Sequence, residues 1–128
     1  MELHPVKCPD VSPDFHPKLR ERFLKKLQEV GANDPQMKGS ISLYKGIETL
    51  PKNYDDIDYL VEQESTFWYL FGVKEADCMA VIHHDTGKTV LFVPHLTEAY
   101  KLWMFVKSNE QFKEDYQVNE VKLTKNLR

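Results

Sequence analysis

The sequence predicts an α/β (α+β) fold in which helices flank a mixed β-sheet. Two observations indicate this class. Apolar residues recur at helical spacing after Pro17, whereas two short apolar runs at residues 78–83 and 89–93 are separated by a turn signal, Asp85-Thr86-Gly87-Lys88. Further helical and strand-like segments follow these runs, so the two kinds of element are interleaved along the chain.

The chain has 128 residues, of which 41% are hydrophobic, and this is the size of one compact domain. We therefore expect a single domain over residues 1–128, with an extended arm at residues 1–16 and a globular part at residues 17–128. Prolines near the start of the chain exclude a continuous helix in the arm, and an extended arm is able to pack as an edge strand.

The first element expected in the globular part is an amphipathic surface helix that starts at Pro17 and ends near Gly31. Glycine suits a helix end because it adopts the left-handed backbone conformation without strain. Apolar side chains repeat at helical spacing along one face, and charged side chains occupy the other. The apolar face comprises Leu19, Phe23, Leu27 and Val30, and the charged face comprises Lys18, Arg20, Glu21, Lys25, Lys26 and Glu29.

Two strands are expected before the middle of the chain. Residues 40–44 alternate apolar and polar side chains, as a half-buried strand does, and the pattern stops at Gly46. A longer polar connection with several acidic residues follows. It leads into a second, short strand at residues 59–61.

A helix and a hairpin follow. Ser65 is expected to cap a helix over residues 66–71 with Gly72 as its left-handed exit, although a strand is a close alternative for this segment. The apolar runs at 78–83 and 89–93 then form an antiparallel hairpin. Both runs are apolar at alternate and intervening positions, so we expect them in the interior of the sheet, covered on both faces.

The last third of the chain is predicted to contain two helices and one strand. Pro94 ends the second strand of the hairpin, and residues 96–106 and 109–116 are interpreted as helices. Ser108 is a natural cap for the second of these helices. A weak final strand is expected at residues 118–123.

Composition excludes several classes of function. A net charge of -3 and a pI of about 5.9 argue against nucleic-acid binding, which depends on concentrated lysine and arginine. No apolar run approaches the roughly 20 residues that span a bilayer, and the chain does not begin with a secretory signal, so no membrane association is expected. Cys8 and Cys78 lie far apart, and we interpret them as free thiols of a cytoplasmic protein.

Metal ligation finds little support in the sequence. His83, His84 and Asp85 form one tight group of ligand types, but successive side chains on a strand point to opposite faces, so the histidines do not readily share an ion. A solvated strand end is the favoured interpretation. A second group of possible metal ligands is acidic and comprises Asp55, Asp56 and Asp58. It lacks the glycine and the closing glutamate of a calcium loop, so we interpret it as a plain acidic loop.

Nucleophilic catalysis is equally unsupported. Ser65 is not in a Gly-x-Ser-x-Gly elbow and has no histidine nearby in sequence, so its role as a helix cap is favoured. Cys78 lies in an apolar strand, where burial suppresses the reactive thiolate. The glycines are isolated turn positions, not a phosphate-binding loop. The sequence therefore predicts no catalytic residue and no metal ligand in this segment.

Large apolar side chains concentrate in two short segments, residues 67–71 and 103–105. Most of the first segment is expected to fill the core, in particular Phe67, Leu70 and Phe71. Core packing and partner contact remain open alternatives for the two tryptophans, because tryptophan is seldom fully buried. These are Trp68 and Trp103.

Several short motifs follow one another between Gln63 and Tyr116. They are Gln63-Glu64-Ser65, Phe67, Tyr69-Leu70-Phe71-Gly72-Val73, Asp85-Thr86-Gly87-Lys88, Leu91-Phe92-Val93-Pro94, Trp103-Met104 and Phe112-Lys113-Glu114-Asp115-Tyr116. In this order they resemble the amino-terminal domain of prolidases, which are Xaa-Pro dipeptidases related to aminopeptidase P and, more distantly, to creatinase. The resemblance runs from the helix at Pro17 to about Val121.

The resemblance implies a creatinase/prolidase amino-terminal domain fold and a noncatalytic role. In the family, a following catalytic domain of pita-bread fold holds two divalent ions, typically manganese, which activate the water that attacks the Xaa-Pro bond. That catalytic domain is absent from these 128 residues. We therefore expect the parent to be an enzyme and the segment alone not to be one. An excised part of a longer chain is favoured over a natural short protein.

The resemblance also implies partners, namely the catalytic domain of the same chain and a second subunit of a homodimer. In such dimers this domain approaches the catalytic cleft of the other subunit. Trp103 matches a family tryptophan and is the leading candidate to line or cover that cleft; Trp68 and His95 are further candidates for substrate access or partner contact. Relatives carry arginine where this chain has Glu62 and His95, and glycine where it has Phe105, so substrate contacts there are expected to differ.

Two alternatives stay open. The same domain occurs in aminopeptidase P, which acts on longer peptides than a dipeptidase does. A catalytically dead relative that binds peptides or histones is a possibility of another class. His95 is compatible with contact to an anionic group when it is protonated, although an ordinary surface histidine is the favoured interpretation.

Overall fold

The computed structural model describes residues 10–52, 57, 58 and 60–127, and within them it contains one β-sheet and three α-helices. Two short 3₁₀ helices lie in the connections between these elements, and a third follows the last strand. The strands are β1 (Ile41–Lys45), β2 (Met79–His83), β3 (Thr89–Val93) and β4 (Glu120–Leu123). The helices are α1 (Phe15–Gly31), α2 (Ser65–Phe71) and α3 (Asn109–Tyr116), with the 3₁₀ helices η1 (Pro35–Met37), η2 (Glu98–Leu102) and η3 (Thr124–Asn126).

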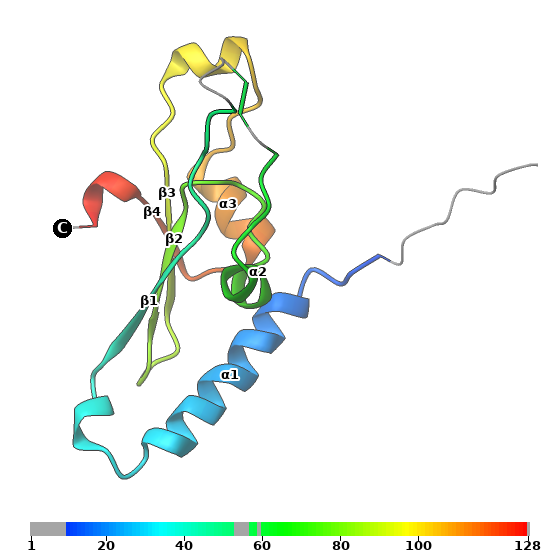
Figure 1. The fold of residues 1–128 in the computed structure, drawn as a ribbon. Coiled ribbons are helices and arrows are strands. Elements are labelled where there is room, and N and C mark those ends of the chain that lie inside the picture. The colour runs from blue at the N-terminus through cyan, green and yellow to red at the C-terminus, as the bar shows by residue number, and fades with distance from the viewer. Residues whose placement is uncertain (1–9, 53–56, 59, 128) are drawn as a thin grey trace, which may run out of the picture.

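The sheet is mixed, as the sequence predicts. Its strand order is β1-β2-β3-β4; β2 is antiparallel to both neighbours, and β3 is parallel to β4. A parallel pair needs a crossover connection, and here η2 and α3 provide it. Figure 1 shows the three α-helices on one side of the sheet and the carboxyl-terminal turn on the other. The predicted α/β class and the predicted hairpin of β2 and β3 are confirmed.

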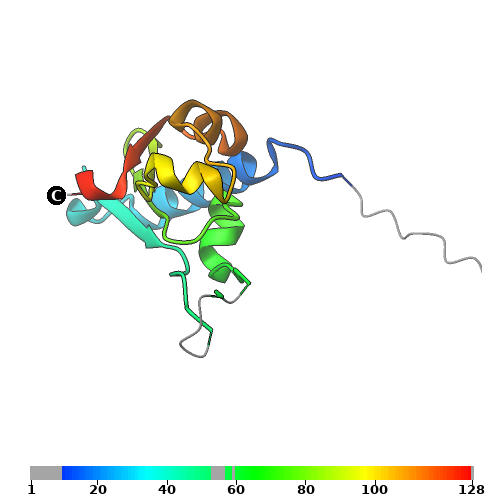
Figure 2. The same cartoon turned by 90° about the horizontal axis from the view of Figure 1, so that it is seen from above.

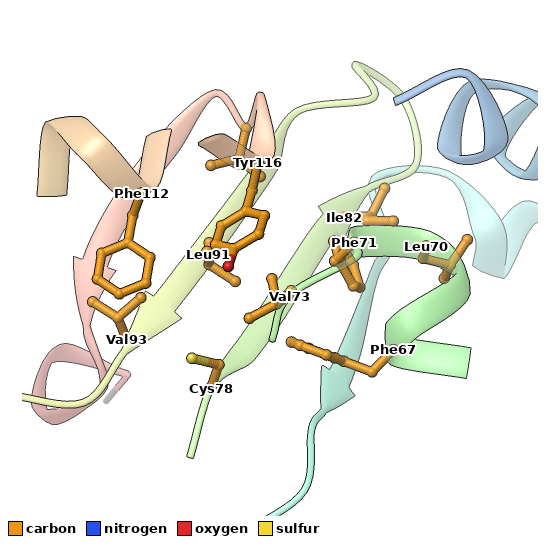
Figure 3. Close-up of a cluster of buried hydrophobic side chains, with 12 residues drawn as sticks. Phe67, Leu70, Phe71, Val73, Cys78, Ile82, Leu91, Val93, Phe112 and Tyr116 are labelled. Atoms are coloured by element: carbon orange, nitrogen blue, oxygen red, sulfur yellow. The ribbon is translucent and has the colours of Figure 1, made fainter. Parts of the chain in front are cut away.

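The main core lies between the helices and the sheet. Phe67, Leu70 and Phe71 of α2 are fully buried, as predicted, and in Figure 3 they lie over the same face of the sheet as the side chains of α3. A smaller cluster on the opposite face joins β2 and β3 to Leu127. Both central strands are therefore buried on both faces, which confirms the expectation from their uninterrupted apolar runs.

Helix α1 begins two residues before its predicted start, and one of its charged side chains is in the core. Arg20, which the helical pattern assigns to the solvent face, is only 7% exposed. Its guanidinium donates to the carbonyl oxygens of Leu70 at 2.9 Å, Tyr116 at 3.3 Å and Gln117 at 2.9 Å. Burial lowers the pKa of Arg20 to about 10. The predicted surface position is wrong because α1 covers the place where α2 and α3 end.

Those three carbonyls explain why an arginine is accommodated there. The last carbonyl groups of a helix have no partner within the helix, and they are costly to bury without a donor. Leu70 lies in the last turn of α2, and Tyr116 and Gln117 lie at the end of α3. One planar guanidinium satisfies carbonyls from both helix ends, so Arg20 ties α1, α2 and α3 together.

The cap of α2 differs from the prediction by one residue. The carboxylate of Glu64, and not the hydroxyl of Ser65, accepts from the amides of Thr66 at 3.0 Å and Phe67 at 2.7 Å. A carboxylate has two oxygens for two amides, whereas a hydroxyl serves one. The helix itself and its left-handed exit at Gly72, with φ of 63°, are confirmed.

Replacing Glu64 with alanine is expected to lower the urea midpoint of unfolding at pH 7. The two amide donors lower the pKa of Glu64, so its stabilisation is complete above the ordinary carboxyl value of 4.5 and is lost as the pH falls through the lowered folded value. The difference between the parent chain and the variant should therefore shrink toward about pH 2. Glu62→Ala, at an exposed neighbouring carboxylate, is the control; an equal loss in both variants would contradict the capping role.

Two predicted elements do not form. The proposed strand at residues 59–61 includes Tyr59, which lies outside the described residues, and Leu60 and Val61 are exposed and not in a strand. The proposed helix at 96–106 is reduced to η2. In both segments the apolar side chains find little to pack against, and a short segment does not gain regular structure from its pattern alone. Of the predicted arm at residues 1–16, residues 10–14 are not in the sheet, and the last two, Phe15 and His16, belong to α1 and are not extended. Cys8 lies outside the described residues.

Two further predictions at the end of the chain are confirmed. Ser108 caps α3, because its hydroxyl accepts from the amide of Gln111 while the Gln111 side chain accepts from the Ser108 amide. This reciprocal arrangement is a capping box. The last strand, β4, forms at Glu120–Leu123, within the predicted range of residues 118–123.

Candidate functional site

A cavity of about 640 Å³ lies at the end of the sheet where β3 and β4 finish. Val93 and Leu123, the last residues of these parallel strands, belong to its wall. Crevices at the carboxyl ends of parallel strands are frequent ligand sites in α/β proteins. A group of apolar wall residues comes from the connection between β3 and α3: Leu96, Tyr100, Met104, Phe105 and Val106.

A charged network lies beside this cavity. The ammonium of Lys107 contacts the carboxylates of Glu75 at 2.8 Å and Asp115 at 3.0 Å, and it lies over the rings of Phe112 and Tyr116. The Tyr116 hydroxyl donates to Glu75. Burial by itself would lower the pKa of Lys107, but the contacts with Glu75 and Asp115 outweigh it and raise that pKa.

This network is an anchor and not an acid–base centre. Burial, with the nearby Glu75 charge, raises the pKa of the Tyr116 phenol to about 12. Tyr116 and Lys107 therefore both keep their protons near neutral pH, whereas a general base is most effective with a pKa close to the working pH. The network fixes the start of α3 to the loop before β2. The sequence gives no sign of it, because Glu75 is far from the other members along the chain.

Trp103 lies on the outer side of the same connection, directly after η2, and 86% of it is exposed. Leu102 and Phe105 are also mostly exposed. His95 is exposed in the loop between β3 and η2. An exposed run of large apolar side chains is typical of a contact surface, because tryptophan and other aromatic residues are frequent anchors at interfaces.

Trp68 occupies a different part of the surface. It lies on α2, is 42% exposed, and its ring makes an edge contact with the imidazole of His16 at 5.4 Å between ring centres. Figure 1 shows η2 at the top of the view and α2 near the middle. The structure thus places His95 and Trp103 on one segment and does not bring Trp68 together with them.

His83, His84 and Asp85 do not form a joint site. His83 is half-buried, whereas His84 is buried, with its ring nitrogens 2.6 Å from Ser40 Oγ and 2.5 Å from Ser42 Oγ. Asp85 instead accepts from a backbone amide in the loop before β1. The prediction of a solvated strand end is therefore wrong for His84. Ser40 lies directly before β1 and Ser42 lies two residues later, so His84 links the start of β1 to the end of β2.

The described residues bring together no group of three or more histidine, cysteine, aspartate or glutamate side chains that could hold a metal ion. Asp55 and Asp56 of the predicted acidic loop are outside this description. Cys78 is buried, and burial, together with the charges of Glu75 and Asp77, raises the pKa of its thiol to about 12, which fits the predicted inert core position. Within the described part of the chain, no helix has the length and apolar character to cross a membrane.

Comparison with known sequences shows to which protein family the chain is similar. A family model described as the amino-terminal domain of aminopeptidase P matches residues 16–128. The Xaa-Pro dipeptidase of Pongo abelii is 40% identical over 106 residues, which cover 82% of this chain and 21% of that protein. The Xaa-Pro dipeptidase of Mus musculus is 39% identical over 106 residues, which again cover 82% of this chain and 21% of that protein. The matched region thus spans about a fifth of the length of these curated relatives.

Comparison with solved structures gives the same fold. Zinc-substituted Escherichia coli aminopeptidase P in complex with product aligns with a TM-score of 0.72 and 19% identity, over 90% of this chain and 25% of that one. The low-pH form of the same enzyme aligns with a TM-score of 0.71 and 18% identity, over the same shares. At these identities the likeness concerns the arrangement of helices and strands.

Proposed function

The chain belongs to the family of aminopeptidase P amino-terminal domains, and from this we propose that it is the noncatalytic amino-terminal domain of a metal-dependent Xaa-Pro dipeptidase. The observation that carries the proposal is its identity of about 40% to proteins named Xaa-Pro dipeptidase over 82% of the chain. In this proposal the rest of the parent protein holds two divalent ions, which we propose are manganese, and cleaves Xaa-Pro dipeptides.

The domain has two roles in this proposal, which are to support dimerisation of the parent and to shape access to its active site. The exposed apolar residues after η2 support the second role, because they are free to lie against another surface. Trp103 would cover the active-site cleft of the second subunit. Its contribution is steric and apolar: it excludes water and limits the space to dipeptide-sized substrates.

The proposal is tested by activity measurements on the chain and on its full-length parent. The purified chain should not hydrolyse an Xaa-Pro dipeptide in the presence of manganese, whereas the parent should do so. Measurable turnover by the chain alone would overturn the noncatalytic role. A parent that prefers an Xaa-Pro tripeptide to the dipeptide would instead be an aminopeptidase.

Trp103→Ala in the parent enzyme is expected to lower kcat/KM for an Xaa-Pro dipeptide by about tenfold and to reduce the preference for dipeptides over tripeptides, since the substrate space becomes larger. The same change in the isolated chain should leave the free energy of unfolding within about 0.5 kcal/mol, because Trp103 is mostly exposed. Leu102→Ala, at an equally exposed apolar neighbour, is the matched control. Equal losses of activity in both variants would contradict a specific role for Trp103.

A further inference from the structure

Strand β1 forms one edge of the sheet. All five of its residues pair with β2, from Ile41 opposite His83 to Lys45 opposite Met79. Along its other side, no strand pairs with β1 among the residues that the structure describes. Figure 2 shows β1 at the margin of the body, away from α3. Such an edge presents unpaired backbone donors and acceptors, and proteins usually protect it with proline, charge or a covering segment.

The hydrogen bonds at both ends of β1 show which residues face this open edge. The amide of His84 donates to the carbonyl of Ser40, and the amide of Gly46 donates to the carbonyl of Cys78. In an antiparallel pair, residues alternate between those that bond the partner strand and those that point away from it. The even-numbered residues of β1 therefore bond β2. The odd-numbered residues direct their N–H and C=O groups outward: Ile41, Leu43 and Lys45.

The side chains of these odd-numbered residues lie on the outer face of the sheet, which is the face opposite the α-helices. Ile41 and Leu43 are 54% and 56% exposed, and Leu43 is paired with Val81, which is buried in the outer apolar cluster. The apolar face is thus continuous from the centre of the sheet to β1, where its side chains are half uncovered. An edge with apolar side chains and free backbone groups favours the addition of another strand.

We infer that β1 pairs antiparallel with β1 of a second copy of the chain, around a two-fold axis at Leu43. This inference deepens the dimerisation part of the proposed function and rests on it. In this register Leu43 lies opposite Leu43 of the second copy, and Ile41 lies opposite Lys45 of the second copy. Every outward N–H and C=O of the three odd-numbered residues then meets a partner. If the register were shifted by one residue, the outward groups of one copy would lie opposite even-numbered residues of the other copy, whose N–H and C=O groups already bond β2.

Charge and symmetry favour a second copy over an unrelated peptide. The pairing is isologous, which means that the same strand of each copy forms the contact. Each Lys45 meets an apolar Ile41, and the two lysines are separated by four strand residues, which is about 13 Å. Like charges are therefore not opposed, and Lys45 already has Glu48 as an ionic partner. On the axis itself, two leucines meet.

Two aspartate substitutions on the same face test the register. Leu43→Asp places two carboxylates directly opposite each other and should raise the dissociation constant of the dimer at least about tenfold. Ile41→Asp places a carboxylate opposite Lys45 of the second copy, so it should leave that constant unchanged or lower it. The two positions are almost equally exposed, so both variants should stay folded. They then differ mainly in the residue of the second copy that lies opposite the new aspartate. The measurement is sedimentation equilibrium up to about 1 mM chain, with circular dichroism as the folding control.

An equal rise of the dissociation constant in both variants would indicate unspecific apolar association and would overturn the inference. A chain that is monomeric at every concentration would also overturn it. The dimerisation part of the proposed function is judged separately, by the mass of the parent enzyme in solution. A dimeric parent that is unaffected by Leu43→Asp would overturn strand pairing alone.

A cross-linking experiment provides a second readout of the register. In a Cys8→Ser background, a short bismaleimide should join two copies of Leu43→Cys but not two copies of Ile41→Cys. The first pair meets on the axis, whereas the second is separated by about 13 Å. Equal cross-linking at both positions would contradict the axis at Leu43.

Discussion

Arg20→Met is expected to lower the free energy of unfolding by about 3 kcal/mol. Methionine keeps the apolar stem of the side chain but removes every donor, so the carbonyls of Leu70, Tyr116 and Gln117 stay buried without the guanidinium. Arg20→Lys should fall between the parent chain and methionine, because an ammonium lacks the planar fork that reaches two helix ends. Urea unfolding of the isolated chain measures the effect.

Arg22→Met is the matched control, since Arg22 lies on the same helix and is exposed. Its cost should stay within about 0.5 kcal/mol. If Arg20→Met cost less than about 1 kcal/mol, the three carbonyls would have to find other donors, and the role of Arg20 at the helix ends would be refuted.

Gly72→Ala is expected to cost about 2 to 3 kcal/mol. The residue has φ of +63°, and an added Cβ would also overlap the imidazole of His16. That ring is held in place, because its Nδ1–H donates to the carbonyl of Tyr69 at 3.0 Å and its edge contacts Trp68. The substitution therefore combines a strained backbone with the displacement of a bonded side chain.

Two comparisons separate these contributions. Gly39 has a similar φ of +71°, but the nearest atom to its added Cβ lies at 3.9 Å, so Gly39→Ala should cost only the backbone strain of about 1 kcal/mol. In a His16→Ala background, Gly72→Ala should likewise cost about 1 kcal/mol. If removing the His16 ring did not reduce the cost, the overlap would not be its cause.

The hairpin of β2 and β3 could be predicted because all of its determinants are local. Two uninterrupted apolar runs and the turn between them fix the strands, their pairing and their central place in the sheet. The segment at 96–106 shows the opposite case. Its apolar side chains follow a helical pattern, but a helix is stabilised by a surface to pack against, and the described residues offer little of one there.

Arg20 and His84 were predicted at the surface because both are polar, and a linear pattern does not show where distant segments converge. The ends of α2 and α3 meet beside Arg20, and His84 is enclosed by Ser40, directly before β1, and Ser42 of β1. At the candidate site, the buried position of Cys78 agrees with the sequence interpretation. For Trp103 the sequence left core packing and partner contact open; its exposure excludes core packing, and partner contact stays a prediction. The network around Lys107 could not be predicted, since it joins residues from separate parts of the chain.

The Lys107 network has a consequence for affinity at the surface that carries Trp103. The connection is held at one end by β3 and at the other by the ion pairs of Lys107 with Glu75 and Asp115. A segment tethered at both ends has less conformational freedom to lose when it docks, and the entropic penalty of association falls accordingly. Pre-organisation of this kind allows a small aromatic contact to contribute more binding free energy than the same residues would in a free tail.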